Sequence, residues 1–122
     1  MRLFQSGGYV VGFSGKWVSA RKSVLELKQD GASLSGTFDS GVADEGVMKV
    51  PVIGWANGDR IAFTCSYEKY GTVIAWVGQL TGEDGHPRIE AQFLHGADVK
   101  EENEAEFLWA ATRVGSDIFV TA

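Results

Sequence analysis

The feature that most constrains the fold is a regular succession of short β-type segments separated by turn residues. Val, Ile, Thr, Phe, Tyr and Trp are abundant, and the chain contains sixteen Gly but only two Pro. β-Branched and aromatic side chains favour pleated strands, whereas Gly, Asn and Asp permit tight turns. The sequence therefore predicts an all-β fold rather than a helical one.

We expect eight strands, at residues 12–19, 23–29, 33–40, 47–55, 60–67, 72–80, 88–95 and 106–113. Eight is the strand number of a small closed barrel. The connections 29–31, 57–59 and 83–87 contain Asp-Gly or Asn-Gly pairs, which join antiparallel neighbours. The expected fold is an eight-stranded antiparallel up-and-down β-barrel, with residues 1–122 forming one domain.

Alternation along the expected strands supports a barrel with one inward face. Leu25 and Leu27 face opposite to Glu26, and Leu34 and Phe38 face opposite to the polar residues between them. The charged run at 100–104 lies in the one long connection, 95–105, where a solvated loop is expected.

Charge and hydropathy exclude several classes of partner. Eleven Lys and Arg against sixteen Asp and Glu give a net charge of −5, and no basic stripe gathers, so nucleic acid is a poor partner. No apolar run approaches the roughly 20 residues that span a bilayer, so we expect no membrane partner. The first residues lack the apolar core of a secretory signal, which implies a cytoplasmic protein or a signal already removed.

Cys65 is the single cysteine, so no intrachain disulfide is expected, and a buried apolar role is favoured over a reactive thiol. The two histidines, His86 and His95, are far apart in the sequence and make no metal-ligand motif. No nucleophile elbow or phosphate loop is present in the sequence. We therefore expect no metal, no cofactor and no enzymatic activity.

Two segments closely resemble the avidin and streptavidin family: Gly15-Lys16-Trp17, and the run WAATRVGSDIF at 109–119. Between them the family's order is kept through residues 34–38, 61–67, 76–79 and 88–94, so the similarity covers essentially residues 13–121. The resemblance implies an eight-stranded barrel that binds biotin at one open end. It also implies a homo-oligomer, either a dimer or a tetramer.

The resemblance further implies three donors to the ureido oxygen of biotin. The family's serine, asparagine and tyrosine fall here on Ser23, Ser19 and Phe38. Ser23 matches, Ser19 is a shorter donor, and Phe38 has no hydroxyl. Since each hydrogen bond in a dry pocket is worth about 1–3 kcal/mol when its partner would otherwise stay unpaired, we expect weaker biotin binding than in typical members.

Asp117 matches the family aspartate that accepts a ureido N–H, and it is the strongest single candidate. Considered without the resemblance, the same residue could instead cap a turn after Gly115-Ser116. The resemblance also implies aromatic walls at Tyr67, Trp76, Phe93 and Trp109; Trp109 would reach across a subunit interface, and Trp76 would pack deeper.

The other ligand contacts that the resemblance implies are Ser40, Val42 with Ala43 and Asp44, Thr72, and Ile74, which stands in place of a threonine.

Two departures from the family pattern add polarity to the expected pocket. Arg21 and His95 stand where the family carries leucines. Each side chain is either a solvated group at the barrel rim or part of a pocket retuned for a carboxylate-bearing ligand.

Three functions remain open on the sequence alone. The first is a small-molecule binding protein for biotin or a related heterocycle. The second is a retuned barrel, including an acid/base enzyme that uses Asp117 and His95. The third is an assembly module that has lost ligand binding.

Overall fold

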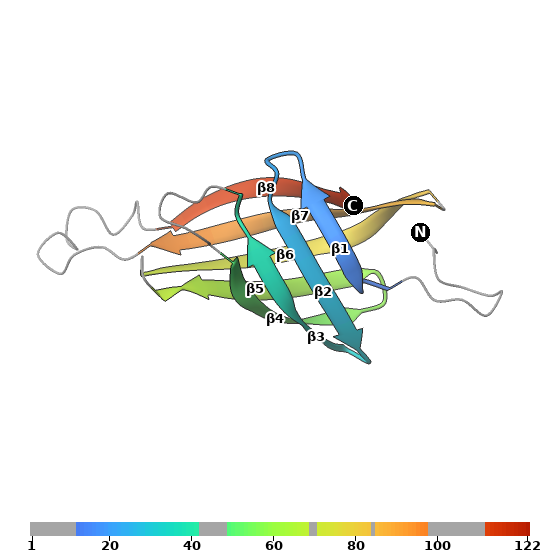
Figure 1. The fold of residues 1–122 in the computed structure, drawn as a ribbon, viewed down its shortest axis with the longest axis horizontal. Coiled ribbons are helices and arrows are strands. Elements are labelled where there is room, and N and C mark those ends of the chain that lie inside the picture. The colour runs from blue at the N-terminus through green and yellow to red at the C-terminus, as the bar shows by residue number, and fades with distance from the viewer. Residues whose placement is uncertain (1–11, 42–48, 69–70, 84, 98–111) are drawn as a thin grey trace, which may run out of the picture.

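The computed structural model describes residues 12–41, 49–68, 71–83, 85–97 and 112–122. Its strands follow one another around a closed barrel in chain order, each antiparallel to its neighbours, and β1 pairs with β8 to close the ring (Figure 1). The predicted up-and-down barrel is thereby confirmed. The strands are β1 (Gly15–Ser19), β2 (Val24–Asp30), β3 (Ser33–Asp39), β4 (Lys49–Asn57), β5 (Arg60–Tyr67), β6 (Thr72–Glu83), β7 (His86–Ala97) and β8 (Thr112–Thr121).

The hairpins form where the turn residues predicted them. Gly31 between β2 and β3 and Gly58 between β4 and β5 have φ angles of 61° and 59°, a left-handed conformation that glycine adopts without strain. The third hairpin is tighter than expected, because Pro87 and His86 pair with Gly82 and Glu83 instead of lying in a loop. Strands β6 and β7 are consequently longer than the sequence predicted.

The eighth strand was placed wrongly along the chain. We expected residues 106–113, whereas β8 runs from Thr112 to Thr121, and residues 106–111 lie outside the described residues. The segment around Gly115 has the local composition of a turn, but its backbone pairs with β7 over its whole length up to Val120. The ladder of hydrogen bonds with β7 outweighs the local turn preference.

The core fills the barrel with large aromatic side chains. Phe63 stacks on Trp76 with ring centroids 4.7 Å apart, and Phe38 packs at a tilt against the same Trp76 ring, with centroids 4.8 Å apart. Phe119 contacts Phe63 edge-on, with centroids 6.4 Å apart. Trp76 is only 2% exposed. Offset and tilted ring pairs of this kind add to the stabilisation from apolar burial.

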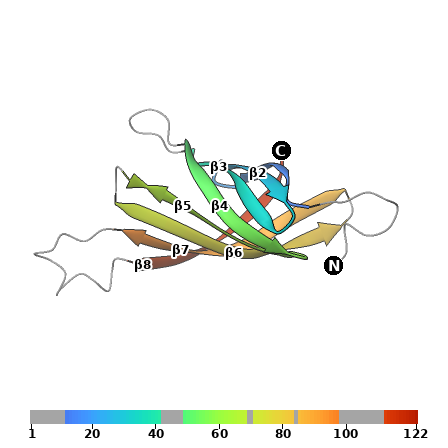
Figure 2. The same cartoon turned by 90° about the horizontal axis from the view of Figure 1, so that it is seen from below.

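The strands differ in length, and the difference shapes the molecule. β6, β7 and β8 extend well past the short strands β1 to β3 at one end, as the two ribbon views show (Figures 1 and 2). Their outer faces carry apolar side chains in contact with solvent, namely Val73, Val77, Leu94, Val114, Ile118 and Val120. No helix long and apolar enough to cross a membrane occurs within the described residues.

Candidate functional site

A pocket of about 240 Å³ opens at the end of the barrel where β1 turns into β2. At about 30 Å³ per molecule, this volume holds roughly eight waters, which suits a small ring compound. The described residues that line it were all among the sequence candidates; they are Arg21, Ser23, Phe38, Ser40, Ile74, Trp76, Phe93, His95 and Asp117.

Asp117 lies on β8 and supplies the carboxylate of the pocket. Its side chain is 11% exposed. The Trp76 indole N–H donates to Asp117 Oδ2 over 3.4 Å, and Arg21 Nε lies 3.9 Å from Asp117 Oδ1. A carboxylate held in this way can accept a further hydrogen bond through Oδ1. The alternative of a turn-capping aspartate is wrong, because Asp117 pairs with Ala91 in the β7–β8 ladder.

Aromatic and apolar side chains form most of the pocket wall. Phe38 and Trp76 are buried at its base, Phe93 is half-buried, and Ile74 packs against the core beside them. Trp76 therefore serves both the core and the pocket, whereas the sequence had suggested packing for it. Flat rings on the walls favour a flat, partly apolar ligand.

Gly115 does not itself line the pocket, but it makes room for a lining residue, and sequence reasoning missed this role. It lies opposite Phe93 in the β7–β8 register, and a Cβ built on it would overlap the Phe93 ring. The missing side chain therefore leaves the space that the ring occupies. A glycine at an inward position of a strand is the sequence signal of such a close approach.

Ser19 is buried and holds the β1–β2 turn. Its Oγ accepts hydrogen bonds from the backbone N–H groups of Arg21 and Ser23, at 3.2 and 3.1 Å, and its backbone pairs with Ser23 and Lys22. Lys22 adopts a positive φ of 67° within this turn. Ser19 was expected to act as a ligand donor, yet it does not line the pocket; it fixes the turn that presents Arg21 and Ser23.

Ser23 and Ser40 form the polar edge of the pocket. The Ser23 hydroxyl donates to the Ser40 backbone carbonyl over 3.2 Å. A hydroxyl has one proton to donate, so Ser23 must turn away from Ser40 before it can donate to a ligand. Phe38 brings no hydroxyl to this edge.

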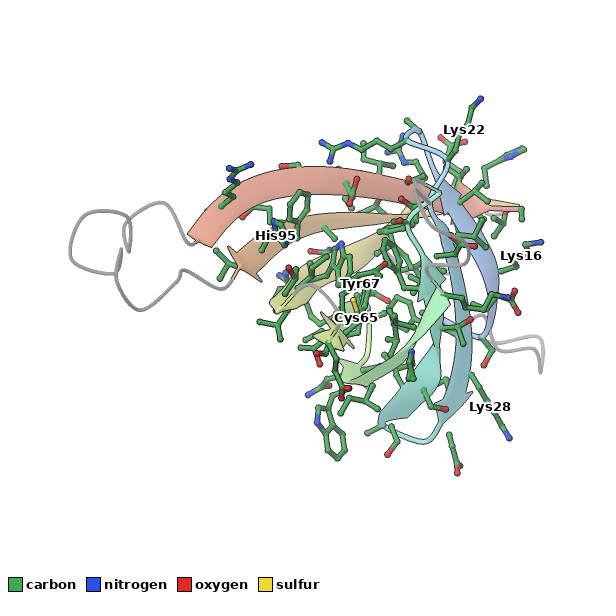
Figure 3. All side chains as sticks on the ribbon, turned by 60° about the vertical axis from the view of Figure 1, so that its left-hand side comes forward. Lys16, Lys22, Lys28, Cys65, Tyr67 and His95 are labelled. Carbon is green, nitrogen blue, oxygen red and sulfur yellow. The ribbon has the colours of Figure 1, made fainter. Side chains whose placement is uncertain are left out.

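The two polar departures from the family pattern both line the pocket. The Arg21 side chain is 64% exposed, and its guanidinium carbon lies 5.7 Å from the centre of the Phe93 ring, within cation–π range. His95 is half-buried on β7, opposite Ile74, and lies near the C-terminal end of that strand (Figure 3). Both side chains therefore belong to the site and not to a remote surface.

Tyr67 and Cys65 lie beside the site inside the barrel, on β5 (Figure 3). Burial raises the pKa of the Cys65 thiol to about 11, as expected for a buried, unreactive side chain. Burial, and to a lesser degree the nearby Cys65, raise the pKa of Tyr67 to about 12. Neither Tyr67 nor Thr72 lines the 240 Å³ pocket.

The remaining predicted contacts, Val42 with its neighbours Ala43 and Asp44, and Trp109, lie outside the described residues. Among the residues that are described, no three His, Cys, Asp or Glu side chains gather closely enough to hold a metal ion.

Comparison with protein families yields one finding for this chain. The model of the Avidin family matches residues 9–122, which is nearly the whole sequence. No curated protein sequence matches the chain. The match covers every strand of the barrel and every residue that lines the pocket.

Proposed function

The chain belongs to the avidin family, and we propose that it binds biotin, or a closely related cyclic ureide, in the pocket around Asp117. One observation carries the proposal: a carboxylate with little exposure stands in the wall of an aromatic pocket, and within the described residues its Oδ1 accepts no hydrogen bond, with Arg21 Nε 3.9 Å away. Such an acceptor suits a ligand that brings an N–H group into a water-poor space.

The ligand is held by one polar contact and several ring contacts. A ureido N–H donates to Asp117 Oδ1, while the fused rings lie against Trp76 and Phe93. Each desolvated aromatic contact contributes through buried apolar area, and the charge-assisted hydrogen bond fixes the orientation of the ring.

We expect weaker affinity than in members with a full set of donors to the ureido oxygen. Phe38 offers no donor, and the Ser23 hydroxyl already donates its one proton to the Ser40 carbonyl. A ureido oxygen left without partners costs about 1–3 kcal/mol for each missing bond, and every 1.4 kcal/mol is a tenfold change in Kd. Two missing donors correspond to a loss of roughly one to four orders of magnitude.

We also propose a homo-oligomer, a dimer or a tetramer. The outer faces of β6, β7 and β8 expose Val73, Val77, Leu94 and Val114, an unusual density of solvent-exposed apolar side chains. A larger hollow of about 630 Å³, lined in part by Ile53, Val73 and Leu94, lies on the same side. Burying this face against a second copy removes it from water.

A binding protein is favoured over an acid/base enzyme. Asp117 and His95 line the same pocket, but the carboxylate oxygens face Trp76 and Arg21. Acid/base catalysis by this pair would need a proton path between the two side chains, and no hydrogen bond or ion pair joins Asp117 to His95 in the described part of the chain.

The test is calorimetric titration with biotin, run beside size-exclusion chromatography with light scattering on the same sample. We expect a saturable heat with one site per chain, from a species larger than a monomer. Asp117→Asn keeps the shape but removes the charge, and it should weaken binding about tenfold or more. A folded oligomer that gives no heat with biotin at any accessible concentration contradicts the proposal and favours an assembly module.

A further inference from the structure

Arg21 connects two walls of the pocket. Its guanidinium lies over the Phe93 ring of β7, while its Nε faces Asp117 of β8. The backbone of Arg21 is held in place, because its N–H donates to Ser19 Oγ in the β1–β2 turn. The side chain is largely exposed, in contrast to the carboxylate that it faces. A tethered but solvated cation therefore stands over a carboxylate that is mostly withdrawn from water.

The distance between Arg21 and Asp117 decides what this cation can do. Charge-assisted N–H···O hydrogen bonds measure about 2.7–2.9 Å, and the Nε–Oδ1 separation is 3.9 Å. The pair attracts without a direct hydrogen bond, so Oδ1 keeps its capacity to accept one. A ligand N–H that reaches Oδ1 must share the carboxylate with the guanidinium or push it aside.

We infer that Arg21 is a specificity-determining residue, which selects cyclic ureides that carry an anionic group on the ring, close to the N–H donor. The N–H binds Asp117 Oδ1, and the anionic group pairs with the displaced guanidinium. The inference rests on the proposed function, because it takes Asp117 as the ligand acceptor. It adds the class of ligand that the pocket prefers.

The charge balance of the pocket supports this preference. Without Arg21, an anionic group near Asp117 would meet the repulsion of the carboxylate in a site of lowered dielectric constant. With Arg21, the same group gains a planar cation that suits carboxylate geometry. A ligand with a neutral ring substituent forms no ion pair with Arg21, yet its N–H still has to compete with Arg21 for Asp117.

The experiment compares two small ligands that differ only in charge. Imidazolidinone carboxylate and the corresponding imidazolidinone carboxamide are each used to displace biotin from the full-length protein, followed by calorimetry. The unmodified protein should prefer the carboxylate by up to about fivefold, the upper end of what an exposed ion pair supplies. The preference should shrink as salt is raised, because the guanidinium is exposed.

Arg21→Leu is the decisive variant, and we expect it to invert the preference so that the carboxamide binds better. Lys28→Leu is the matched control, since Lys28 is an exposed cation on β2 that points away from the barrel (Figure 3). It removes the same charge and should leave the preference unchanged. Arg21→Lys keeps the charge and should retain part of the preference.

Three results overturn the inference. If biotin binds but Arg21→Leu keeps the preference of the unmodified protein, Arg21 does not set specificity, although the proposed function stands. If neither small ligand displaces bound biotin, the pocket does not recognise the ring in the proposed way. If biotin binds neither to the unmodified protein nor to the Arg21→Leu variant, the proposed function is wrong and so is the inference that rests on it.

Discussion

The indole N–H of Trp76 donates to Oδ2 of Asp117 over 3.4 Å, which connects the ring at the centre of the core to the carboxylate of the pocket. The ring is packed between Phe38 and Phe63. A rigid ring therefore holds the acceptor in a fixed orientation before any ligand arrives, and preorganisation of this kind lowers the cost of binding.

Replacing Trp76 with Phe should weaken biotin binding about five- to tenfold. The substitution keeps an aromatic ring but removes the N–H donor, whose bond to a charged acceptor is worth about 1–1.5 kcal/mol at this length. The smaller ring also leaves a void, so the free energy of unfolding should fall by about 1–3 kcal/mol. Calorimetry gives the first quantity and denaturant unfolding gives the second.

The matched control is Trp17→Phe. Trp17 is equally buried, and its indole N–H donates to the Phe13 carbonyl over 2.9 Å, but it does not line the pocket. Both variants should lose stability, and only Trp76→Phe should lose affinity in samples that remain folded. Equal loss of affinity in the two variants would show that the Trp76–Asp117 bond has no special part in binding.

Phe38→Tyr should tighten biotin binding. Phe38 lines the pocket, and a hydroxyl on its ring adds the donor that is missing at the polar edge, for a gain of about 1 kcal/mol or roughly fivefold. Combining it with Ser19→Asn should add less than sequence comparison suggests, because Ser19 Oγ already accepts two backbone N–H groups. Titration of the single and double variants tests both statements. Lower stability without any gain in affinity would mean that the new hydroxyl enters the core.

Gly115→Ala should disturb the pocket wall. The added methyl group overlaps the Phe93 ring, so the ring must move or the strands must separate, at a cost of about 1–3 kcal/mol in unfolding free energy. Gly96→Ala is the control on β7, since its Cβ would meet only ordinary contacts, the nearest at 3.5 Å to Val73. Gly115→Ala should lower both the thermal unfolding midpoint and the affinity for biotin more than Gly96→Ala does. Equal behaviour would show that the Phe93 ring relocates without cost.

The sequence predicted the barrel, its strand order and the described residues that line the pocket, but it also named Ser19, Tyr67 and Thr72, which do not line it. It did not predict the ends of all the strands. Inward alternation at Leu25 and Leu27 is a local signal, and it fixes which face is buried. The run from Val114 to Asp117 has the composition of a turn, and only its pairing with β7, about twenty residues earlier in the chain, makes it part of β8. The two backbone N–H groups that donate to Ser19 Oγ depend likewise on the backbone path of the β1–β2 turn, which composition does not determine.

Stability should fall at alkaline pH because of two buried acids. Burial raises the pKa of Cys65 from 9.0 to about 11 and that of Tyr67 from 10.0 to about 12. The folded protein thus holds these protons at pH values where the unfolded chain has lost them, and ionisation favours the unfolded chain. The contribution is complete below about pH 9, and it is lost as the pH rises towards 11 for the thiol and 12 for the phenol. Cys65→Ala should flatten the decline between pH 9 and 11 while leaving the later one, as measured by urea unfolding across that range. An unchanged profile in this variant would show that the thiol is not the group that titrates.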